Sequence, residues 1–360
     1  MLLLPARRCI VHFSLDCSCL FVQLPLRIAR VMVLLLDAPA SLAPQLPLKR
    51  ALDAYAYLQQ QLVEQDICTR ADGRPLESFV ELVDRIYCVN HDAMRLVAQA
   101  VQQQQQTLDH SAFLTEFFCH RVRLRTLCGQ ASALWNSSDA TRSARARQKT
   151  DDGSSDYSPK DTRGATKFGD TGQIGALQNR VHIAGCLSDA AAAAGDVCLR
   201  TFGTAPEVDV VGDVSASLLY MPDHLFGVFF ELLKNSMRAV CERHGDASYK
   251  LPPICLRVYD GAQNITISVT DQGDGFSAAS LRDIFRFHYS TSASKVNVGD
   301  DAVSIYHSGS RSNAMAGHGY GLPLARINVR CFGGDIILAP LQGSGCVAFV
   351  YLQKRSDAAF

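Results

Sequence analysis

The chain has 360 residues, more than one hydrophobic core usually serves, so we expect two domains. Its 35 lysines and arginines equal its 35 aspartates and glutamates, which gives no electrostatic reason to expect nucleic acid or an acidic membrane as a partner. The thirteen cysteines form no CxxC pair, and no HExxH run is present, so neither a zinc site nor a redox pair is indicated.

The first 23 residues contain two arginines and one acid, a composition compatible with a mitochondrial presequence. A secretory signal is the competing interpretation, but Asp16 interrupts the apolar segment that such a signal needs. The later run VMVLLL at 31–36 is far shorter than the ~20 residues that cross a bilayer. We therefore expect targeting to an organelle and no transmembrane helix.

Residues 24–135 carry a helical pattern. Three long segments, at 46–65, 76–106 and 110–135, place apolar residues three and four positions apart, and long helices with few strand signals predict a bundle. Residues 136–173 are nearly empty of large apolar side chains, so we predict a disordered insertion, either a modification site or only a loop. A further helix is predicted at 176–199, bridging the bundle to the C-terminal part of the chain.

After residue 199 the pattern changes to strands mixed with helices, which predicts an α+β sandwich with helices on one face of a sheet. We predict a helix at 222–245 and a helix that begins near Pro323 and ends at Gly333. Strands are predicted at 215–221, 254–260 and 264–271, and a closing hairpin is predicted at 334–341 and 346–353.

The helix at 222–245 carries an unusual polar row. We expect Asp223 as its N-cap, and its buried stripe contains Leu225, Val228, Phe229, Leu232, Ala239 and Val240. Glu231, Asn235, Arg238 and Glu242 follow at spacings of four, three and four on another side. A solvated face is the ordinary interpretation of such a row. The polar and glycine-rich elements located further along the chain favour a binding site instead.

Three such elements come after this helix. Asp271 ends a strand beside Gly273 and Gly275, where a carboxylate accepts a hydrogen bond from an exocyclic amine and glycines admit a flat ring such as adenine. A tight turn is the alternative. Ser290 and Thr291 offer hydroxyls, and the glycines 317, 319 and 321 lead into a helix N-terminus that would attract phosphate. The loop at 294–316 suits a lid over ATP, or disorder without function.

In this order, the elements resemble the N box, the Asp-Gly-Gly box and the glycine-rich G2 box of the GHKL ATPases, which include gyrase, Hsp90, histidine kinases and MutL. The strings LLYMPDHL, FELLKNSMRA, YSTSA and GHGYGLPLARINVRCFGGDI are similar to the mitochondrial 2-oxo-acid dehydrogenase kinases, meaning pyruvate dehydrogenase kinase and its branched-chain relative. The resemblance covers nearly all of the chain outside 1–23 and 136–173. It implies a four-helix-bundle-like domain at 24–199 and a GHKL ATP-binding domain at 200–360.

The resemblance implies a mitochondrial matrix kinase that transfers the γ-phosphate of Mg-ATP to serines of the E1 α subunit. Its further implied partners are the lipoyl domain of E2 and a second copy of the chain in a homodimer. Glu231 would be the general base, Asn235 a Mg²⁺ ligand and Asp271 the adenine reader. The ATP-binding residues that it implies are Glu231, Asn235, Arg238, Asp271, Gly273, Gly275, Ser290, Thr291, Gly317, His318, Gly319, Tyr320, Gly321 and Leu322.

The sequence departs from that family at two positions near the implied site. Gly227 stands where the pyruvate dehydrogenase kinases usually carry a histidine one turn before the glutamate, and Cys346 replaces a threonine that typically supports the adenine site. Three alternatives remain. Either the substrate is the branched-chain complex, or the chain is a nucleotide-binding scaffold without kinase activity, or it is a two-component histidine kinase, although a lone helical histidine such as His91 is more often structural than a phosphoacceptor. A missing receiver or sensor module argues against the last.

Overall fold

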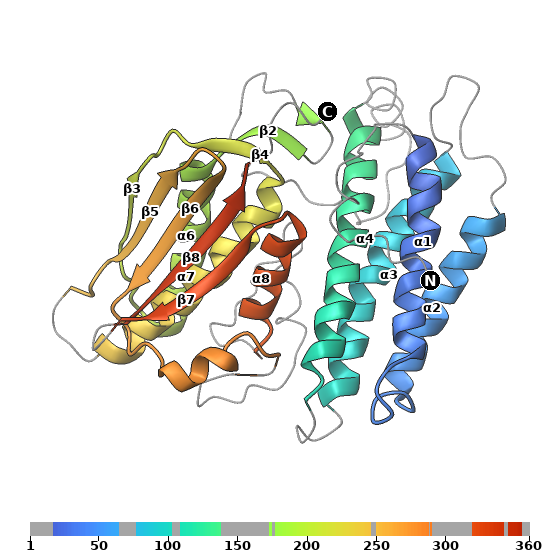
Figure 1. Cartoon of the computed structure of the whole chain (residues 1–360), viewed down its shortest axis with the longest axis horizontal. Helices are drawn as coiled ribbons and strands as arrows, with labels where there is room; N and C mark the ends of the chain where they lie inside the picture. Colours follow the sequence, from blue (N-terminus) through green and yellow to red (C-terminus); the bar gives the residue numbers. More distant parts are fainter. Residues whose placement is uncertain are drawn as a thin grey trace, which may run out of the picture. The chain divides into compact units, whose positions relative to one another are not determined.

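The computed structural model describes residues 17–64, 77–102, 109–137, 173–174, 177–245, 250–287, 289, 319–341 and 345–354. The described residues form two compact units, a helical one at 17–137 and a mixed one at 177–354 (Figure 1). The predicted insertion lies almost wholly outside the described residues, as do the predicted lid and the first 16 residues. No helix in the described ranges is both long enough and apolar enough to span a membrane.

The helical unit contains α1 (Cys17–Leu36), α2 (Leu46–Glu64), α3 (Glu77–Gln102) and α4 (Ser111–Ser137). Helices α1 and α3 each pack against both α2 and α4, so the four helices enclose one core (Figure 1). Apolar side chains at helical spacing fill this core, among them Leu24, Ile28, Val31 and Leu35 of α1. The predicted bundle is therefore confirmed, although α1 begins inside the segment that we expected to be a presequence.

A polar bridge crosses the core of the bundle. Tyr55 of α2 donates its hydroxyl hydrogen to Asn90 Oδ1 on α3 at 2.8 Å. Asn90 Nδ2 donates to the carbonyl oxygen of Arg121 on α4 at 3.1 Å, and Arg121 Nε donates back to the Asn90 carbonyl at 3.0 Å. All three side chains are buried, so each bond satisfies a group that would be costly to leave unpaired. Burial also raises the pKa of Tyr55, which stays neutral.

Asn90→Ala is expected to lower the free energy of unfolding of the helical unit by about 2 to 4 kcal/mol, because it leaves the Tyr55 hydroxyl and the Arg121 carbonyl buried without this partner. Urea unfolding followed by circular dichroism measures the change. Ser132→Ala is the matched control, since it removes an exposed hydrogen bond to Asp84 in the same unit. A control that costs as much as Asn90→Ala would contradict the assignment.

The mixed unit is built on a five-stranded sheet in the order β3–β5–β6–β8–β7. The strands are β3 (Val208–Gly212), β5 (Ile254–Asp260), β6 (Asn264–Asp271), β7 (Asp335–Pro340) and β8 (Cys346–Gln353). Strand β3 runs parallel to β5, and the other neighbours are antiparallel. A smaller sheet has the order β1–β2–β4, with β1 (Gln173–Ile174), β2 (Leu177–His182) and β4 (Ser217–Tyr220).

Helices α6 (Ile183–Phe202), α7 (Pro222–His244) and α8 (Gly321–Cys331) share one core with the larger sheet. Helix α7 packs against α6, α8 and β6, while α8 packs against β7 and β8 (Figure 1). Alternate residues of the strands face these helices, for example Ile265, Ile267 and Val269 of β6. The predicted α+β sandwich is confirmed by this arrangement.

Three sequence expectations differ from the structure. Residues 177–182 form strand β2 instead of the start of a helix, because they pair with β4 in an antiparallel ladder. Helix α6 packs on α7, so the mixed unit begins before the boundary expected at residue 200. Asp223 is not the N-cap of α7; Met221 holds that position without a side-chain bond, and Asp223 lies in the first turn. A negative charge in the first turn still interacts favourably with the helix dipole.

Candidate active site

Glu231 lies on α7 and is buried, with 2% of its surface exposed. Its Oε1 accepts a hydrogen bond from Lys234 Nζ at 2.9 Å, and Lys234 is equally buried. The ammonium also lies 5.4 Å from the ring centre of Phe230. A buried carboxylate needs such a partner, because an unpaired buried charge is strongly destabilising. Sequence reasoning missed Lys234; its position three residues after Glu231 was the available signal.

The start of α8 lies against the carboxylate of Glu231. A β-carbon built on Gly321 would overlap Glu231 Oε2 and would lie 2.9 Å from Glu231 Cδ, so any other residue there would have to displace the carboxylate or the start of α8. Gly319 has a φ of 76°, which glycine adopts without strain. The structure thus joins two predicted elements, the polar row of α7 and the end of the glycine-rich loop, including Tyr320 and Leu322. Gly317, His318, Ser290 and Thr291 lie outside the described residues.

Asp271 ends β6 and is also buried, with 2% of its surface exposed. Its Oδ2 accepts hydrogen bonds from Ser236 Oγ at 2.9 Å and from Cys346 Sγ at 3.1 Å. Its Oδ1 accepts from the backbone N–H groups of Gly273 at 3.0 Å and Cys346 at 3.4 Å. The register of the sheet explains part of this network, since Asp271 pairs with Cys346 across β6 and β8.

Cys346 therefore bonds the carboxylate from the position where the family threonine would stand. Burial and the nearby Asp271 raise the pKa of the Cys346 thiol, so the thiol keeps its proton and remains a donor. The sequence predicted only the loss of a hydroxyl at this position. It contained no sign of Ser236, whose hydroxyl reaches Asp271 from α7.

The loop after Asp271 is fastened to α7. A β-carbon on Gly273 would lie 2.5 Å from the Ala239 β-carbon, so the close approach of α7 requires glycine here. Gly275 has a φ of 67°, and a β-carbon built on it would lie 2.5 Å from the carbonyl oxygen of Gly345. Arg243 Nη1 donates to the Gly273 carbonyl oxygen at 2.6 Å. Asp271 and the polar row of α7 are thus held in one small region.

The rest of the row runs from the interior to the surface. Asn235 is half-buried. Arg238 is 15% exposed, and its Nε lies 3.8 Å from Oε1 of Glu242, which is 49% exposed. That Nε is buried and has no hydrogen-bond partner among the described residues. The row is therefore not a solvated face, because its first acid is buried and only its last acid is well exposed. Gly227, one turn before Glu231, is buried as well.

Two family models match the chain. The model described as mitochondrial branched-chain alpha-ketoacid dehydrogenase kinase matches residues 13–160, and the model described as histidine kinase-, DNA gyrase B-, and HSP90-like ATPase matches residues 221–356. Curated relatives named pyruvate dehydrogenase kinase match nearly the full length of the chain. The chain belongs to the mitochondrial 2-oxo-acid dehydrogenase kinase family. It is accordingly a protein kinase with a GHKL ATPase domain.

The relatives of this kinase include [pyruvate dehydrogenase (acetyl-transferring)] kinase of Arabidopsis thaliana, 27% identical over 93% of the chain and 84% of that protein. The Schizosaccharomyces pombe kinase of the same name is 30% identical over 72% of the chain, and the match spans 55% of the length of that relative. Mouse isozyme 3 is 26% identical over 94% of the chain and 76% of its own length. A solved structure of the mycobacterial sensor histidine kinase MprB covers 47% of the chain and 95% of its own, with TM-score 0.33 and 16% identity.

The described residues of the kinase fit a nucleotide with Mg²⁺. Backbone N–H groups at the start of α8 suit phosphate, and the Arg238 Nε–H, which has no hydrogen-bond partner among the described residues, suits a phosphate oxygen. The buried carboxylate of Asp271 suits the exocyclic amine of adenine. The amide oxygen of Asn235 is a ligand type that Mg²⁺ accepts, together with phosphate oxygens.

Gly321→Ala is expected to lower phosphate transfer by about 10²-fold, because the added β-carbon would displace either the Glu231 carboxylate or the start of α8. Initial rates with labelled ATP measure the change. Gly185→Ala is the matched control, since a β-carbon there meets no atom within 4 Å. Unchanged transfer in the Gly321 variant would show that this close approach does not matter.

Proposed function

We propose that this kinase transfers the γ-phosphate of Mg-ATP to a serine hydroxyl of the E1 α subunit of pyruvate dehydrogenase, and so inactivates the complex. The observation that carries the proposal is the position of Glu231. Its carboxylate lies against the first residue of α8, where backbone N–H groups suit phosphate. A base beside a phosphate site is the arrangement that phosphoryl transfer to a hydroxyl requires.

In this proposal, Glu231 accepts the proton of the serine hydroxyl as the oxygen attacks the γ-phosphorus of ATP. The bond from that phosphorus to the β,γ-bridging oxygen breaks, and ADP is the leaving group. Lys234 holds the carboxylate in place through its 2.9 Å hydrogen bond to Oε1, which leaves Oε2 on the side of Gly321. The site contributes mainly position and charge neutralisation, because phosphoryl transfer needs little covalent chemistry from the protein. The N–H groups of α8 and Arg238 would offset the charge of the phosphates.

The two remaining proposed roles are adenine recognition by Asp271 and Mg²⁺ binding by Asn235. Asp271 accepts the hydrogen bond of the adenine amine while Ser236 and Cys346 hold its carboxylate in one orientation. Asn235 would ligate Mg²⁺ through its amide oxygen. The bound ion neutralises negative charge on the phosphate oxygens. Ser290, Thr291, Gly317 and His318 complete the proposed nucleotide set.

The proposed location is the mitochondrial matrix, and the proposed partners are E1 α, the lipoyl domain of E2 and a second copy of the chain. The curated relatives are named as mitochondrial kinases of pyruvate dehydrogenase, which supports the pyruvate complex as the substrate. The family model for the helical region carries the branched-chain name, and that specific match makes the branched-chain complex the second candidate.

The two candidates are separated by one competition experiment. Purified pyruvate and branched-chain E1 components are mixed with the kinase and labelled Mg-ATP, and label on each α subunit is measured. Faster labelling of pyruvate E1, with loss of its dehydrogenase activity, is the expected result. Preferential labelling of branched-chain E1 would show that the branched-chain complex is the substrate. Binding of ATP without label on either α subunit would favour a nucleotide-binding scaffold over a kinase.

A further inference from the structure

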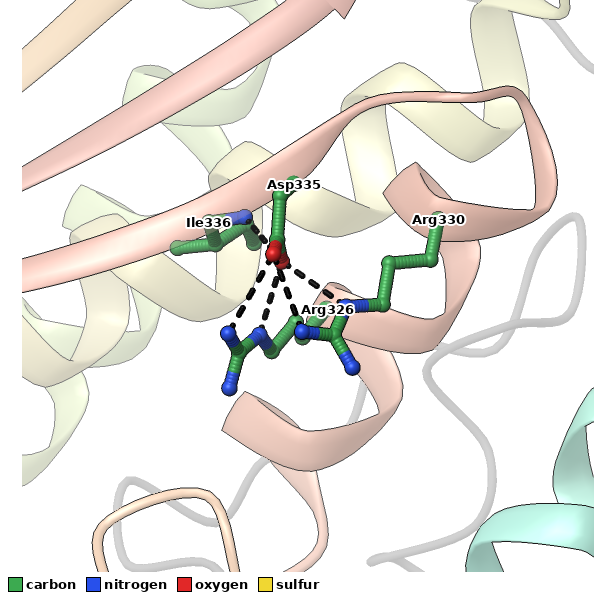
Figure 2. Close-up of polar contacts among 4 residues, drawn as sticks. All are labelled: Arg326, Arg330, Asp335 and Ile336. Atoms are coloured by element: carbon green, nitrogen blue, oxygen red, sulfur yellow. Dashed lines mark hydrogen bonds and ion pairs between the residues drawn. The ribbon is translucent and has the colours of Figure 1, made fainter. Parts of the chain in front are cut away.

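Two arginines on one side of α8 share a single carboxylate. Arg326 Nε and Nη2 donate to Asp335 Oδ1 and Oδ2 at 2.7 and 3.2 Å, and Arg330 Nε and Nη2 donate to the same oxygens at 2.9 and 2.9 Å (Figure 2). The Ile336 N–H also donates to Oδ1 at 2.8 Å. This cluster, which we call the Asp335 clamp, joins α8 to the first residue of β7.

The clamp persists at neutral pH. Partial burial raises the pKa of Asp335, but the hydrogen bonds from Arg330, Arg326 and Ile336 outweigh burial and lower that pKa well below its usual value. A lowered pKa means that the clamp stabilises the fold whenever the carboxylate is ionised and is lost only in strong acid. Two guanidinium groups face one carboxylate, so a net positive charge remains at the cluster.

The two arginines differ in what else they contact. The Arg326 guanidinium carbon lies 4.1 Å from the ring centre of Phe285, within the range of a cation–π contact. Arg326 is 25% exposed and Arg330 is 49% exposed. Phe285 belongs to residues 283–287, which follow the short helix η1 (Ala278–Arg282) and lie downstream of Asp271. Arg326 therefore links the clamp to the chain segment that comes from the adenine side of the site.

A second contact fastens the same segment to α8. Phe287 packs edge-on against Tyr320, with ring centres 5.4 Å apart, and both side chains are buried. Tyr320 is the residue immediately before α8, next to the phosphate end of the site. Residues 283–287 are thus attached to α8 at two points, at its N-terminus through Tyr320 and more than one turn later through Arg326.

We propose that Arg326 is a positioning residue for the nucleotide: it holds residues 283–287 against α8 and so fixes the adenine side of the site relative to the phosphate side. The inference rests on the proposed function, because it takes Asp271 and the start of α8 as the two ends of one nucleotide site. Arg330 strengthens the clamp without forming the Phe285 contact that the inference requires. A change at Arg326 alters nucleotide affinity, whereas an equivalent change at Arg330 alters only stability.

The test uses the full chain and Mg-ADP as the probe. Titration calorimetry is expected to show that Arg326→Gln raises the Kd for Mg-ADP by about three- to tenfold, the effect of one cation–π contact. Arg330→Gln removes the same number of bonds to Asp335 and is expected to change Kd by less than about twofold. Thermal unfolding of both variants, measured in parallel, shows whether they lose similar stability.

Changes at Phe285 provide a second, independent arm. Phe285→Leu is expected to raise the Kd for Mg-ADP as Arg326→Gln does. Phe285→Tyr keeps the aromatic ring and is expected to leave the Kd at the wild-type value. The double variant Arg326→Gln/Phe285→Leu is expected to bind no more weakly than either single variant, because the two residues act through one contact. In steady-state kinetics, KM for ATP rises and kcat changes little, since a positioning effect on nucleotide binding is shared by ground and transition states.

The outcomes separate this inference from the proposed function. An unchanged Kd in Arg326→Gln, equal effects of Arg326→Gln and Arg330→Gln, or additive effects in the double variant would overturn the role of Arg326 and leave the proposed kinase activity in place. A wild-type protein that binds no Mg-ADP would overturn both.

Discussion

Glu231→Gln is expected to slow phosphate transfer by about 10²- to 10⁴-fold, the usual contribution of a general base, while Mg-ATP binding is retained. Glutamine preserves an oxygen that accepts the 2.9 Å hydrogen bond from Lys234 Nζ, but it no longer accepts a proton. Alanine at this position is a less informative choice. Both substitutions leave the buried Lys234 without its counter-charge, but alanine also removes the acceptor of its hydrogen bond and would destabilise the unit by about 3 to 5 kcal/mol.

Glu242→Gln is the matched control for this result. Glu242 ends the same polar row but is 49% exposed, and its ion pair with Arg238 is long, at 3.8 Å. Its replacement should leave transfer within about twofold of the wild-type rate. Rates are measured with labelled ATP at saturating E1, and nucleotide binding is measured on the same preparations. Wild-type transfer by the Glu231 variant would remove this residue from the mechanism.

Asp271→Ala is expected to raise the Kd for Mg-ATP by about 10²-fold or more and to abolish the preference for adenine over guanine nucleotides. The side chain is the buried acceptor at the adenine end of the site, and removing a charged partner from a buried hydrogen bond costs about 3 kcal/mol. The substitution also removes the acceptor of Ser236 and Cys346, so some loss of stability accompanies it. The ratio of ATP to GTP affinity separates recognition from folding, because a folding defect affects both nucleotides equally.

Cys346→Ala is the companion variant. It removes one donor to Asp271 Oδ2 and leaves the carboxylate in place, held by Ser236 and the Gly273 N–H. We expect a Kd increase of about two- to fivefold, in keeping with the loss of one weak donor. If the Asp271 variant binds ATP with wild-type affinity, or if the two variants are equally impaired, adenine is not read by Asp271.

Strong local patterns made part of the fold predictable. Strands β5 and β6 have the bounds expected from the sequence, because alternate residues are apolar and a polar turn separates the strands. Strand β3 was missed, since its side chains are exposed or half-buried and its apolar–polar alternation is limited to Val208, Asp209 and Val210. Strand β2 was taken as helix because it precedes an alanine-rich helix, and only its pairing with β4 distinguishes the two.

The candidate site was also predictable only in part from the sequence. Glu231, Asp271 and Gly321 lie within short motifs, so the sequence could single them out before any fold was known. Lys234 and Ser236 lie in the same motif as Glu231 but were not singled out, because a lysine or a serine on a helix is ordinarily solvated and only the tertiary structure buries them. The reason for Gly273 was also beyond the sequence, since the excluded neighbour is Ala239 of another element.

The measurement that tests the central claim most directly is the transfer of labelled γ-phosphate from Mg-ATP to E1 α by the wild-type kinase and by Glu231→Gln, with the labelled residue located by mass spectrometry. Label on a serine with the wild-type protein, lost in the variant although both bind Mg-ATP, is the result we predict. Equal labelling by both proteins, or Mg-ATP binding by the wild-type protein without any label on E1, would contradict it.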